Sequence, residues 1–471
     1  MAIRRMGSYI DLTPAKESYE DTVKDIDSMI SGFVLGIESM EAALTLSEVS
    51  TEDMSVRERK SYNLALEHIG RSVNIKPALE AEEDEDGETG VWAFIKRIWR
   101  KVCDTFASIW EKITNLFTDV DDRVKKADEK VEKKVEKLEE AIKTIDEPAK
   151  ETKDEGGEPK PSLDPKHHDD KVNFIADKDG KITKDSVEKA LANLEALNKF
   201  LRDGFPKAVK ASVSELKTSV GKISKTIEDF TPTDRANHTD TREDVNSDEL
   251  RTEVLNFLNT VVTKSKKAIG TNGTESSLFG TIAEVNVPVS DTTMVTYDEY
   301  KTTHSIGVDR VTRLVIRLPH LEENDASDLG HLCNLQAFPS VRREEEDKGR
   351  VDIDMHGFFL SDKKKLEDIV NTLVSRVKNH TKSNSDVNLK ALCSETHNSC
   401  KETEVIITKL LDAKRADSNT VKPMLNFIKK SLSGAMQDLT VVETMAELPP
   451  KLMMHVVKYL DACVVYSKAK V

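Results

Sequence analysis

The stretch VWAFIKRIWRKVCDTFASIWEKITNLFTDVDDRVKKADEKVEKKVEKLEEAIKTI, residues 91–145, decides the fold of this chain. Its apolar residues recur at alternating gaps of three and four, the heptad pattern of an amphipathic helix, with one slip near Val120. No Pro or Gly interrupts it. We therefore predict one helix of about 55 residues, roughly 80 Å long. The apolar seam that we assign to its first half consists of Trp92, Ile95, Trp99, Val102, Phe106 and Trp110.

The two halves of this predicted helix differ in composition. The first half holds every tryptophan of the chain, together with the cluster Lys96, Arg97, Arg100 and Lys101. The second half, 120–145, is a Lys/Glu helix with a narrow Val/Leu/Ile stripe. We therefore expect the first half to be buried and the second to be largely solvated. The partner of the seam is either a second copy of the chain or the chain's own helices within 185–269.

Composition sets the class of protein. The chain has 471 residues, enough for two to four units with buried cores. Charged residues make up 33% and aromatic residues 5%, a balance typical of long solvated helices. The net charge of −15 argues against general nucleic-acid binding. Five scattered cysteines favour free thiols in a reducing compartment, and we find neither a secretory signal nor an 18-residue apolar run that could span a membrane.

The order of patterns along the chain predicts a mainly α protein, with a long coiled-coil-like helix and a C-terminal helical region that contains a small α+β part. The acidic run of Glu80 to Glu88 has seven acidic residues in nine, so we interpret it as a linker. We expect these parts: an N-terminal helical hairpin at 1–77, an acidic linker at 78–90, the long amphipathic helix at 91–147, a disordered linker at 148–170, a hairpin plus helical unit at 171–270, and an α+β then helical C-terminal domain at 271–471.

Finer patterns predict individual elements. Two short strands are expected at 172–175 and 181–183, around an Asp-Gly turn. Alternating Val, Ile, Thr and Tyr predict further strands, and a charged loop is expected at 342–350. The predicted strands are 278–287, 293–300, 310–318 and 351–360; the predicted helices are 185–202, 207–230, 247–269, 362–379 and three more within 387–467.

The sequence offers little catalytic chemistry. It has no phosphate-cradling glycine loop, dinucleotide fingerprint, nucleophile elbow or zinc-protease helix. Cys393, His397 and Cys400 share one face of a predicted helix, but a fourth ligand is lacking, and packing of the cysteines is the commoner explanation. The loop at 177–180 lacks two of the strongest ligands of a calcium site. We therefore expect no enzyme activity, no cofactor and no bound metal.

The order of three segments resembles the internal structural head proteins of giant, phiKZ-like tailed bacteriophages. A helical pair ends in LALEHIGRSVNIKPALEAE at 64–82, and the tryptophan-rich basic helix VWAFIKRIWRKVCDTFASIWEKI follows at 91–113. A later run, HGFFLSDKKKLEDIVNTLVSRV at 356–377, also fits this family. The likeness is firm over about 18–140. The long acidic run after Glu80 departs from the family pattern, which places the boundary of any propeptide in question.

The resemblance implies a non-enzymatic virion structural protein, made in the infected bacterial cytoplasm and packaged inside the capsid. Its implied partners are other virion and capsid proteins. In this family the helical pair belongs to a propeptide, and a head-maturation protease cuts after Glu in a small-x-Glu tripeptide. That pattern fits several places, and access to protease favours the segment after Pro77. The processing residues that we assign are Ala78, Leu79, Glu80 and Ala81.

Three further hypotheses follow from the helix at 91–145. It could mediate self-association through its seam. The basic cluster Lys96, Arg97, Arg100 and Lys101 is a candidate contact for a polyanion, with packaged DNA as a candidate partner. The tryptophans beside a basic face also resemble a helix that lies on a bilayer, so the alternative functions are a membrane-active or ejected protein and a non-phage cytoplasmic coiled-coil scaffold. We expect no obligate membrane association.

Overall fold

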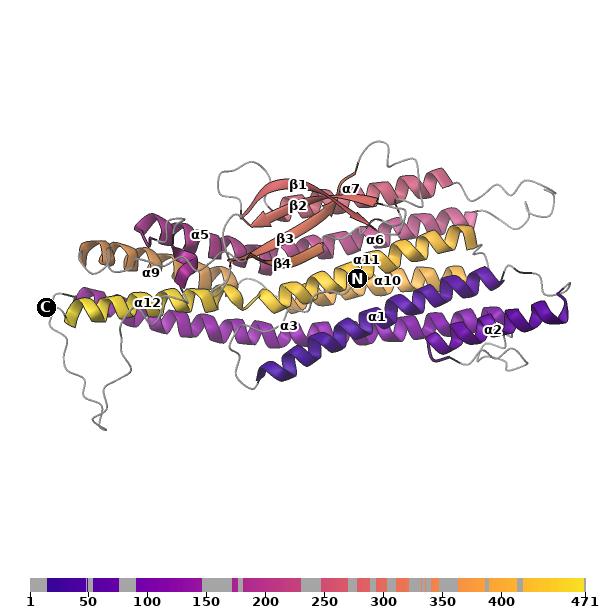
Figure 1. The fold of residues 1–471 in the computed structure, drawn as a ribbon, viewed down its shortest axis with the longest axis horizontal. Coiled ribbons are helices and arrows are strands. Elements are labelled where there is room, and N and C mark those ends of the chain that lie inside the picture. Colours follow the sequence, from indigo (N-terminus) through magenta and orange to yellow (C-terminus); the bar gives the residue numbers. More distant parts are fainter. Residues whose placement is uncertain are drawn as a thin grey trace. The chain divides into compact units, whose positions relative to one another are not determined.

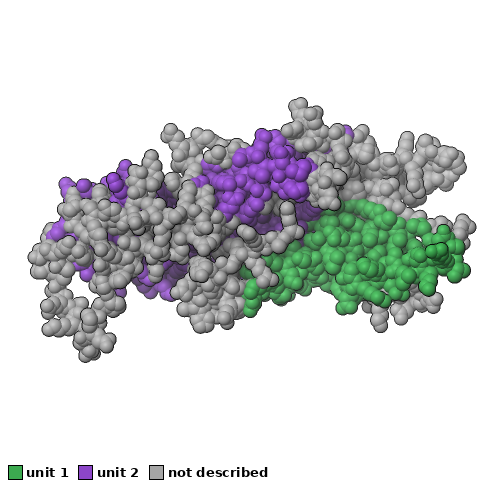
Figure 2. Space-filling model, in the orientation of Figure 1, with its two compact units in different colours: residues 1–115, 407–429 green, residues 116–406, 430–471 purple. Residues whose placement is uncertain are grey.

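A computed structural model places most of the helices and a small sheet of the chain (Figure 1). It describes residues 15–47, 49, 54–75, 90–145, 172–176, 181–229, 247–269, 278–288, 294–302, 311–321, 332, 335, 340–346, 363–385, 389–412 and 418–469. These residues belong to two compact units. Unit 1 comprises residues 1–115 and 407–429, and unit 2 comprises residues 116–406 and 430–471 (Figure 2).

The long helix exists as predicted. Helix α3 runs Val91–Lys143, and its first 25 residues, 91–115, belong to unit 1 while the remainder belong to unit 2. It starts after Gly90, whose φ of +87° suits glycine, and the Phe94 amide donates to the Gly90 carbonyl at 3.2 Å. An uninterrupted sequence of helix-compatible residues lets the backbone ladder continue over the whole length.

Unit 1 is built from helices only, among the residues that the structure describes. Its elements are α1 (Ala15–Ser47), α2 (Val56–Ser72), the start of α3, the end of α10 (Leu389–Asp412) and the start of α11 (Ser418–Met445). A capping box fixes the start of α2: the Glu58 amide donates to Ser55 Oγ, and the Ser55 amide donates to Glu58 Oε2 at 2.8 Å. The Ser55 hydroxyl and the Ser55 amide both interact with the Glu58 carboxylate and lower the pKa of Glu58.

Helix α1 is apolar enough to need an explanation. By length and composition alone, Asp21–Ser47 could cross a membrane, and it is the one such helix within the described residues. This corrects the expectation that no segment would pass that test. Inside unit 1 one face of α1 is buried, however, including Ile26, Ile30, Phe33 and Ile37. A core helix of a soluble protein has this composition for that reason.

Unit 2 contains the remaining helices and the sheet. Its helices are the rest of α3, α5 (Lys184–Lys199), α6 (Phe205–Asp229), α7 (Ser247–Ile269), α9 (Lys363–Ser385), most of α10 and α11, and α12 (Leu448–Ala469); a π-helical turn, η3 (Phe200–Gly204), joins α5 to α6. The start of α7 and its end fall where the sequence predicts them.

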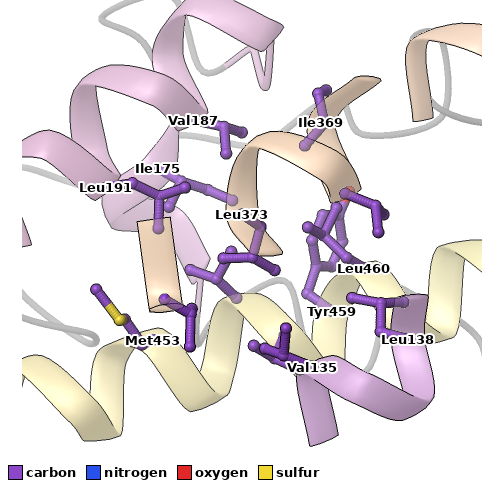
Figure 3. Packing of buried hydrophobic residues seen from close by; sticks show 14 of the residues in the cluster. Val135, Leu138, Ile175, Val187, Leu191, Ile369, Leu373, Met453, Tyr459 and Leu460 are labelled. Atoms are coloured by element: carbon purple, nitrogen blue, oxygen red, sulfur yellow. The ribbon is translucent and has the colours of Figure 1, made fainter. Parts of the chain in front are cut away.

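The main core of unit 2 gathers helices from distant parts of the sequence. The stripe of α3 that includes Val135 and Leu138 packs with buried residues of α5, α9 and α12 (Figure 3). The expectation that the second half of α3 is largely solvated is therefore wrong for its stripe, since every member from Val120 to Ile142 except Ala127 is buried. Several lysines on the polar face, including Lys125, Lys130 and Lys133, are exposed as expected, whereas Asp128 is buried.

The hairpin expected around the Asp-Gly turn is also corrected. Asn173–Ile175 forms a 3-10 helix, η2, rather than a strand. Val172 and Ile175 are three residues apart, so one helical turn directs both into the core that also holds Ile182. Thr183 then caps α5, because the Ser186 amide donates to Thr183 Oγ1 at 3.1 Å. The loop at 177–180 lies outside the described residues.

The sheet is a four-stranded antiparallel meander in the order β1-β2-β3-β4 (Figure 1). Strands β1 (Phe279–Pro288), β2 (Met294–Thr302) and β3 (Val311–Pro319) lie where the sequence predicts strands. The fold class is thus mainly α with a small antiparallel sheet, as predicted. The strand expected at 351–360 lies outside the described residues.

Strand β4 (Ser340–Glu346) replaces part of the charged loop expected at 342–350. Its charges are satisfied across the sheet rather than by solvent alone. Glu344 accepts from Lys301 at 2.9 Å, and Arg342 lies 3.4 Å from the buried Glu299, which also pairs with Arg317 at 2.6 Å. Cross-strand ion pairs of this kind stabilise an edge strand that its composition does not favour.

Helix α11 carries an ionisable group at a fully buried position. Asp438 is 3% exposed, and the Val341 amide of β4 donates a hydrogen bond to its carboxyl group. Desolvation by burial raises the pKa of Asp438 well above its ordinary value, and the Val341 hydrogen bond opposes this only in part. The carboxyl group therefore keeps its proton in the folded state at pH values where it has lost that proton in the unfolded chain.

We expect Asp438→Asn to remove a pH dependence from stability. Because the folded pKa is raised, the unfolded state binds fewer protons above about pH 4, so wild-type stability falls as pH rises toward the folded pKa. The fall is at most about 1.4 kcal/mol for each pH unit. Urea midpoints of the wild type and the variant, measured at several pH values from about pH 4 upward, should diverge until the pH reaches the folded pKa of Asp438. Parallel curves would contradict a neutral, buried Asp438.

Candidate functional site: the tryptophan-rich start of α3

The tryptophan-rich start of α3 supplies the core of unit 1. Trp110, Phe106 and Ile95 are buried at 0–1% exposure, and Trp99 is 5% exposed. Phe106 packs on Phe33 of α1, with ring centroids 5.5 Å apart, and meets Trp110 edge to face at 6.0 Å. Aromatic contacts of this kind add to the stabilisation from burial itself. The predicted seam is therefore a packed core surface within unit 1.

Helix α1 approaches α3 closely at one glycine. A Cβ atom added to Gly36 would lie 2.7 Å from Val102 Cγ2, which is shorter than real side chains allow. The absence of a side chain at Gly36 thus lets Val102, a member of the predicted seam, reach the α1 backbone. Val102 is 3% exposed as a result.

The seam partners differ in part from those expected. In unit 1 the seam packs on α1, and the Trp99 Nε1 hydrogen donates to Thr408 Oγ1 of α10 at 2.8 Å. In unit 2 the stripe packs with α5, which lies within the expected range 185–269, and also with α9 and α12, which do not. The seam residues are thus already packed within the chain. Trp92, at the start of α3, stays partly exposed.

The predicted basic cluster divides between two environments. Lys96 is 8% exposed and belongs to the packed side of α3. Arg97, Arg100 and Lys101 instead line a groove of about 740 Å³ in unit 1. The other lining residues are Met29 of α1, Asn74 and Ile75 just after α2, and Asp104, Thr105 and Ser108 of α3. The structure therefore brings three of the four predicted cations to one surface.

Two of these cations interact with uncharged oxygens. Lys101 Nζ donates to the Val73 carbonyl at 2.6 Å, just beyond the end of α2. Arg97 Nε donates to the Ala93 carbonyl one turn earlier at 3.4 Å. Arg100 and Lys101 are exposed and Arg97 is partly exposed. The hydrogen bonds orient the cations while leaving their charge available to the groove.

The structure gives less support to the other candidate sites of the sequence. Cys393 and Cys400 are buried in α10, and burial raises the pKa of the Cys400 thiol well above its ordinary value, which disfavours a thiolate ligand. Within the described ranges, no group of three or more His, Cys, Asp or Glu residues is placed to hold a metal ion. Ala78, Leu79, Glu80 and Ala81 lie outside the described residues.

Comparison with known proteins gives the family. A family model described as phiKZ-like phage internal head proteins matches residues 10–269, which is more than half of the chain. The chain belongs to this family. The matched range includes all of α1, α2 and α3, and hence the seam and the basic groove. No curated protein and no solved structure matches the chain.

Membership of the phiKZ-like internal head proteins agrees with the resemblance found in the sequence. It gives the chain a structural role inside a phage head, in association with virion components. The groove residues Asn74 and Ile75, contributed from beyond α2, were not predicted. Their signal was weak, because sequence periodicity shows which face of α3 is basic but not which element lies beside it.

Proposed function

We propose that this internal head protein is a non-enzymatic structural component, packaged in the capsid interior and processed by a head-maturation protease after Glu80. The observation that carries the proposal is the family match over residues 10–269, which spans both the α1–α2 pair and the tryptophan-rich helix. The burial of the seam is consistent with this role, because it makes the tryptophan-rich face part of a core.

The burial of the same seam argues against a membrane-active function. A helix that lies on a bilayer inserts its aromatic face between lipids. Here Trp99, Phe106 and Trp110 are at most 5% exposed and pack within unit 1. Insertion would first have to separate α3 from α1. Self-association through 91–145 meets the same obstacle, so we expect copies to associate through other surfaces.

The burial of competing tripeptides supports the proposed processing site. The tripeptides Ser39-Met40-Glu41, Ala65-Leu66-Glu67 and Ser186-Val187-Glu188 also match a small-x-Glu pattern. All three lie inside helices, α1, α2 and α5, and the middle residue of each is 0% exposed. A protease requires an extended, accessible backbone, so each competitor would have to unfold locally before it could be cut. Ala78-Leu79-Glu80 lies outside the described residues, and its selection rests on the sequence, where it follows Pro77 and enters the acidic run.

We expect the protein in mature particles to begin at Ala81. Mass spectrometry of purified virions should find peptides from residues 91–469, and N-terminal sequencing should give Ala81. The same chain made alone in an uninfected host should begin at Met1 or Ala2, because the phage protease is absent there. A Glu80→Gln variant supplied during infection serves as the matched control and should stay uncut.

Two results would count against this proposal in different ways. Absence of the protein from purified virions removes the packaging role. Its presence with a start at Met1 or Ala2 leaves packaging intact and removes the processing. After a cut, α1 and α2 remain held to the rest of unit 1 by contacts such as Phe33–Phe106, so cleavage and loss of the N-terminal piece are separate events.

A further inference from the structure

We infer that the basic groove of unit 1 binds phosphate groups of a nucleic-acid backbone through Arg97, Arg100 and Lys101. The groove, defined by its lining residues above, is formed by α3, the residues that follow α2 and Met29 of α1. Its volume of about 740 Å³ is within the range of small-molecule ligand sites. The inference rests on the proposed function only for the identity of the nucleic acid, which inside a phage head is the packaged genome.

Two of the groove cations, Arg97 and Lys101, differ in their partners from several other basic residues of the chain. Several lysines elsewhere pair with carboxylates, among them Lys112 with Asp25, Lys210 with Glu395 and Lys217 with Glu402. For Arg97 and Lys101, in contrast, no carboxylate partner occurs among the described residues, and both donate to neutral carbonyl oxygens. Their positive charges are thus left for an external anion.

The arrangement of the cations suits phosphate. Arg97, Arg100 and Lys101 stand at i, i+3 and i+4, so they project from one side of α3 within a single turn. Arginine presents a fork of N–H donors that matches two phosphate oxygens, and lysine adds a point charge. The single carboxylate of the lining, Asp104, leaves positive charge in excess. The hydroxyls of Thr105 and Ser108 donate to helix carbonyls, so the hydrogen-bond donors for a bound phosphate come from the cations.

The shape and surroundings of the groove favour a nucleic acid over an anionic membrane. A bilayer presents a flat surface, and proteins that bind it insert exposed aromatic residues beside their cations. Here Trp99 and Trp110 are buried on the other side of α3. The phosphodiester backbone is a narrow ridge of regularly spaced charges, which a groove lined by cations can follow. The acidic remainder of the chain repels this backbone, so binding depends on the groove and weakens with salt.

The test is a titration of the full-length protein with fluorescently labelled duplex DNA at several salt concentrations. Three phosphate contacts predict a slope of log affinity against log salt of about −2.7, so affinity falls about 40-fold between about 50 and about 200 mM salt. The variant Arg97→Gln/Arg100→Gln/Lys101→Gln should bring the slope close to zero. Glutamine keeps helix propensity, and circular dichroism checks that each variant is folded.

The matched control neutralises three exposed lysines on the distal half of the same helix: Lys125→Gln/Lys130→Gln/Lys133→Gln. It changes the net charge equally and should leave the slope unchanged. A second variant, Arg100→Glu, reverses one exposed charge without touching the Lys101–Val73 hydrogen bond and should weaken binding at least 10-fold.

Three outcomes would overturn the inference. They are an affinity that does not fall with salt, an equal loss in the groove variant and the distal control, and binding of vesicles with 30% anionic lipid but not of DNA. Inorganic phosphate serves as a further arm: displacement of DNA by phosphate only at concentrations that act through ionic strength supports a backbone site. These measurements use purified protein. DNA binding can therefore be absent although the protein is found in virions, and it can be present although the protein is absent from them.

Discussion

Substitution of Trp99 by Asp should lower the free energy of unfolding by about 3–5 kcal/mol, the range for large losses of a buried aromatic residue. Trp99 is 5% exposed, and its Nε1 hydrogen donates to Thr408 at 2.8 Å. The substitution removes this ring and hydrogen bond and places a carboxylate in an apolar environment, where it can find no compensating hydration. Urea unfolding followed by circular dichroism measures the change.

The matched control for this prediction is Trp92→Asp on the same helix. Trp92 is partly exposed, so the carboxylate there can remain hydrated and we expect a loss of about 1 kcal/mol or less. Trp99→Phe keeps most of the apolar surface and loses only the hydrogen bond, and it should fall between the two. Equal midpoints for wild type and Trp99→Asp would mean that the seam is not a core, and would revive the membrane-active alternative.

The elements of this fold that local sequence determines were the predictable ones. The long helix follows from apolar spacing and from the lack of Pro and Gly over 53 residues. The bounds of α7 and the strands β1, β2 and β3 follow from periodicity in the same way. In each case the pattern lies within one element, so no knowledge of the rest of the chain is needed.

The failures concern residues whose environment is set by distant parts of the chain. The sequence of β4 resembles a loop because it is highly charged. It forms a strand because Lys301 and Glu299, about 40 positions away, pair with its charges. The stripe of α3 in unit 2 appeared too narrow to be a core, yet α12 covers it from more than 300 residues away, as the Lys134–Asp461 pair shows. Sequence periodicity identifies a face but not its partner.

The burial of Lys96, which we did not predict, could have been inferred from its position in the sequence. Lys96 was grouped with Arg97, Arg100 and Lys101 because the four are close along the chain. It lies four residues after Trp92 and three before Trp99, which places it on the seam side of the helix. Its 8% exposure follows from that position. The groove itself could not have been found this way, since Asn74 and Ile75 reach it only through the packing of unit 1.

Unit 2 depends on a buried charge that periodicity does not reveal. Arg202 lies in the π-helical turn η3 and is 4% exposed, and its Nη2 donates to Asp121 of α3 at 3.2 Å. Burial lowers the pKa of Arg202, while the charges of Asp121 and Asp128 oppose this effect. Asp128 is itself 7% exposed. The guanidinium group thus compensates two carboxylates on α3 in a largely dehydrated environment.

We expect Arg202→Ala to destabilise unit 2 by about 3–5 kcal/mol, the range for breaking a buried ion pair by removing one partner. Lys134→Ala is the matched control, because its pair with Asp461 also joins α3 to another helix but is partly exposed, and its loss should cost about 1 kcal/mol or less. Urea midpoints followed by circular dichroism compare the two. Similar small losses in both variants would show that Arg202 carries no such compensation.

A double variant distinguishes the effect of losing the Arg202–Asp121 ion pair from the effect of losing the packing of the Arg202 side chain. Within the described residues, Nε and Nη1 of Arg202 have no hydrogen-bond partner, so the pair does not recover the full cost of dehydrating the guanidinium group. Arg202→Met/Asp121→Leu replaces both partners by apolar groups of similar size and should regain much of the stability that Arg202→Ala loses. If the double variant is as unstable as Arg202→Ala, the loss comes from packing of the arginine side chain or from the charge of Asp128, which the double variant leaves in place.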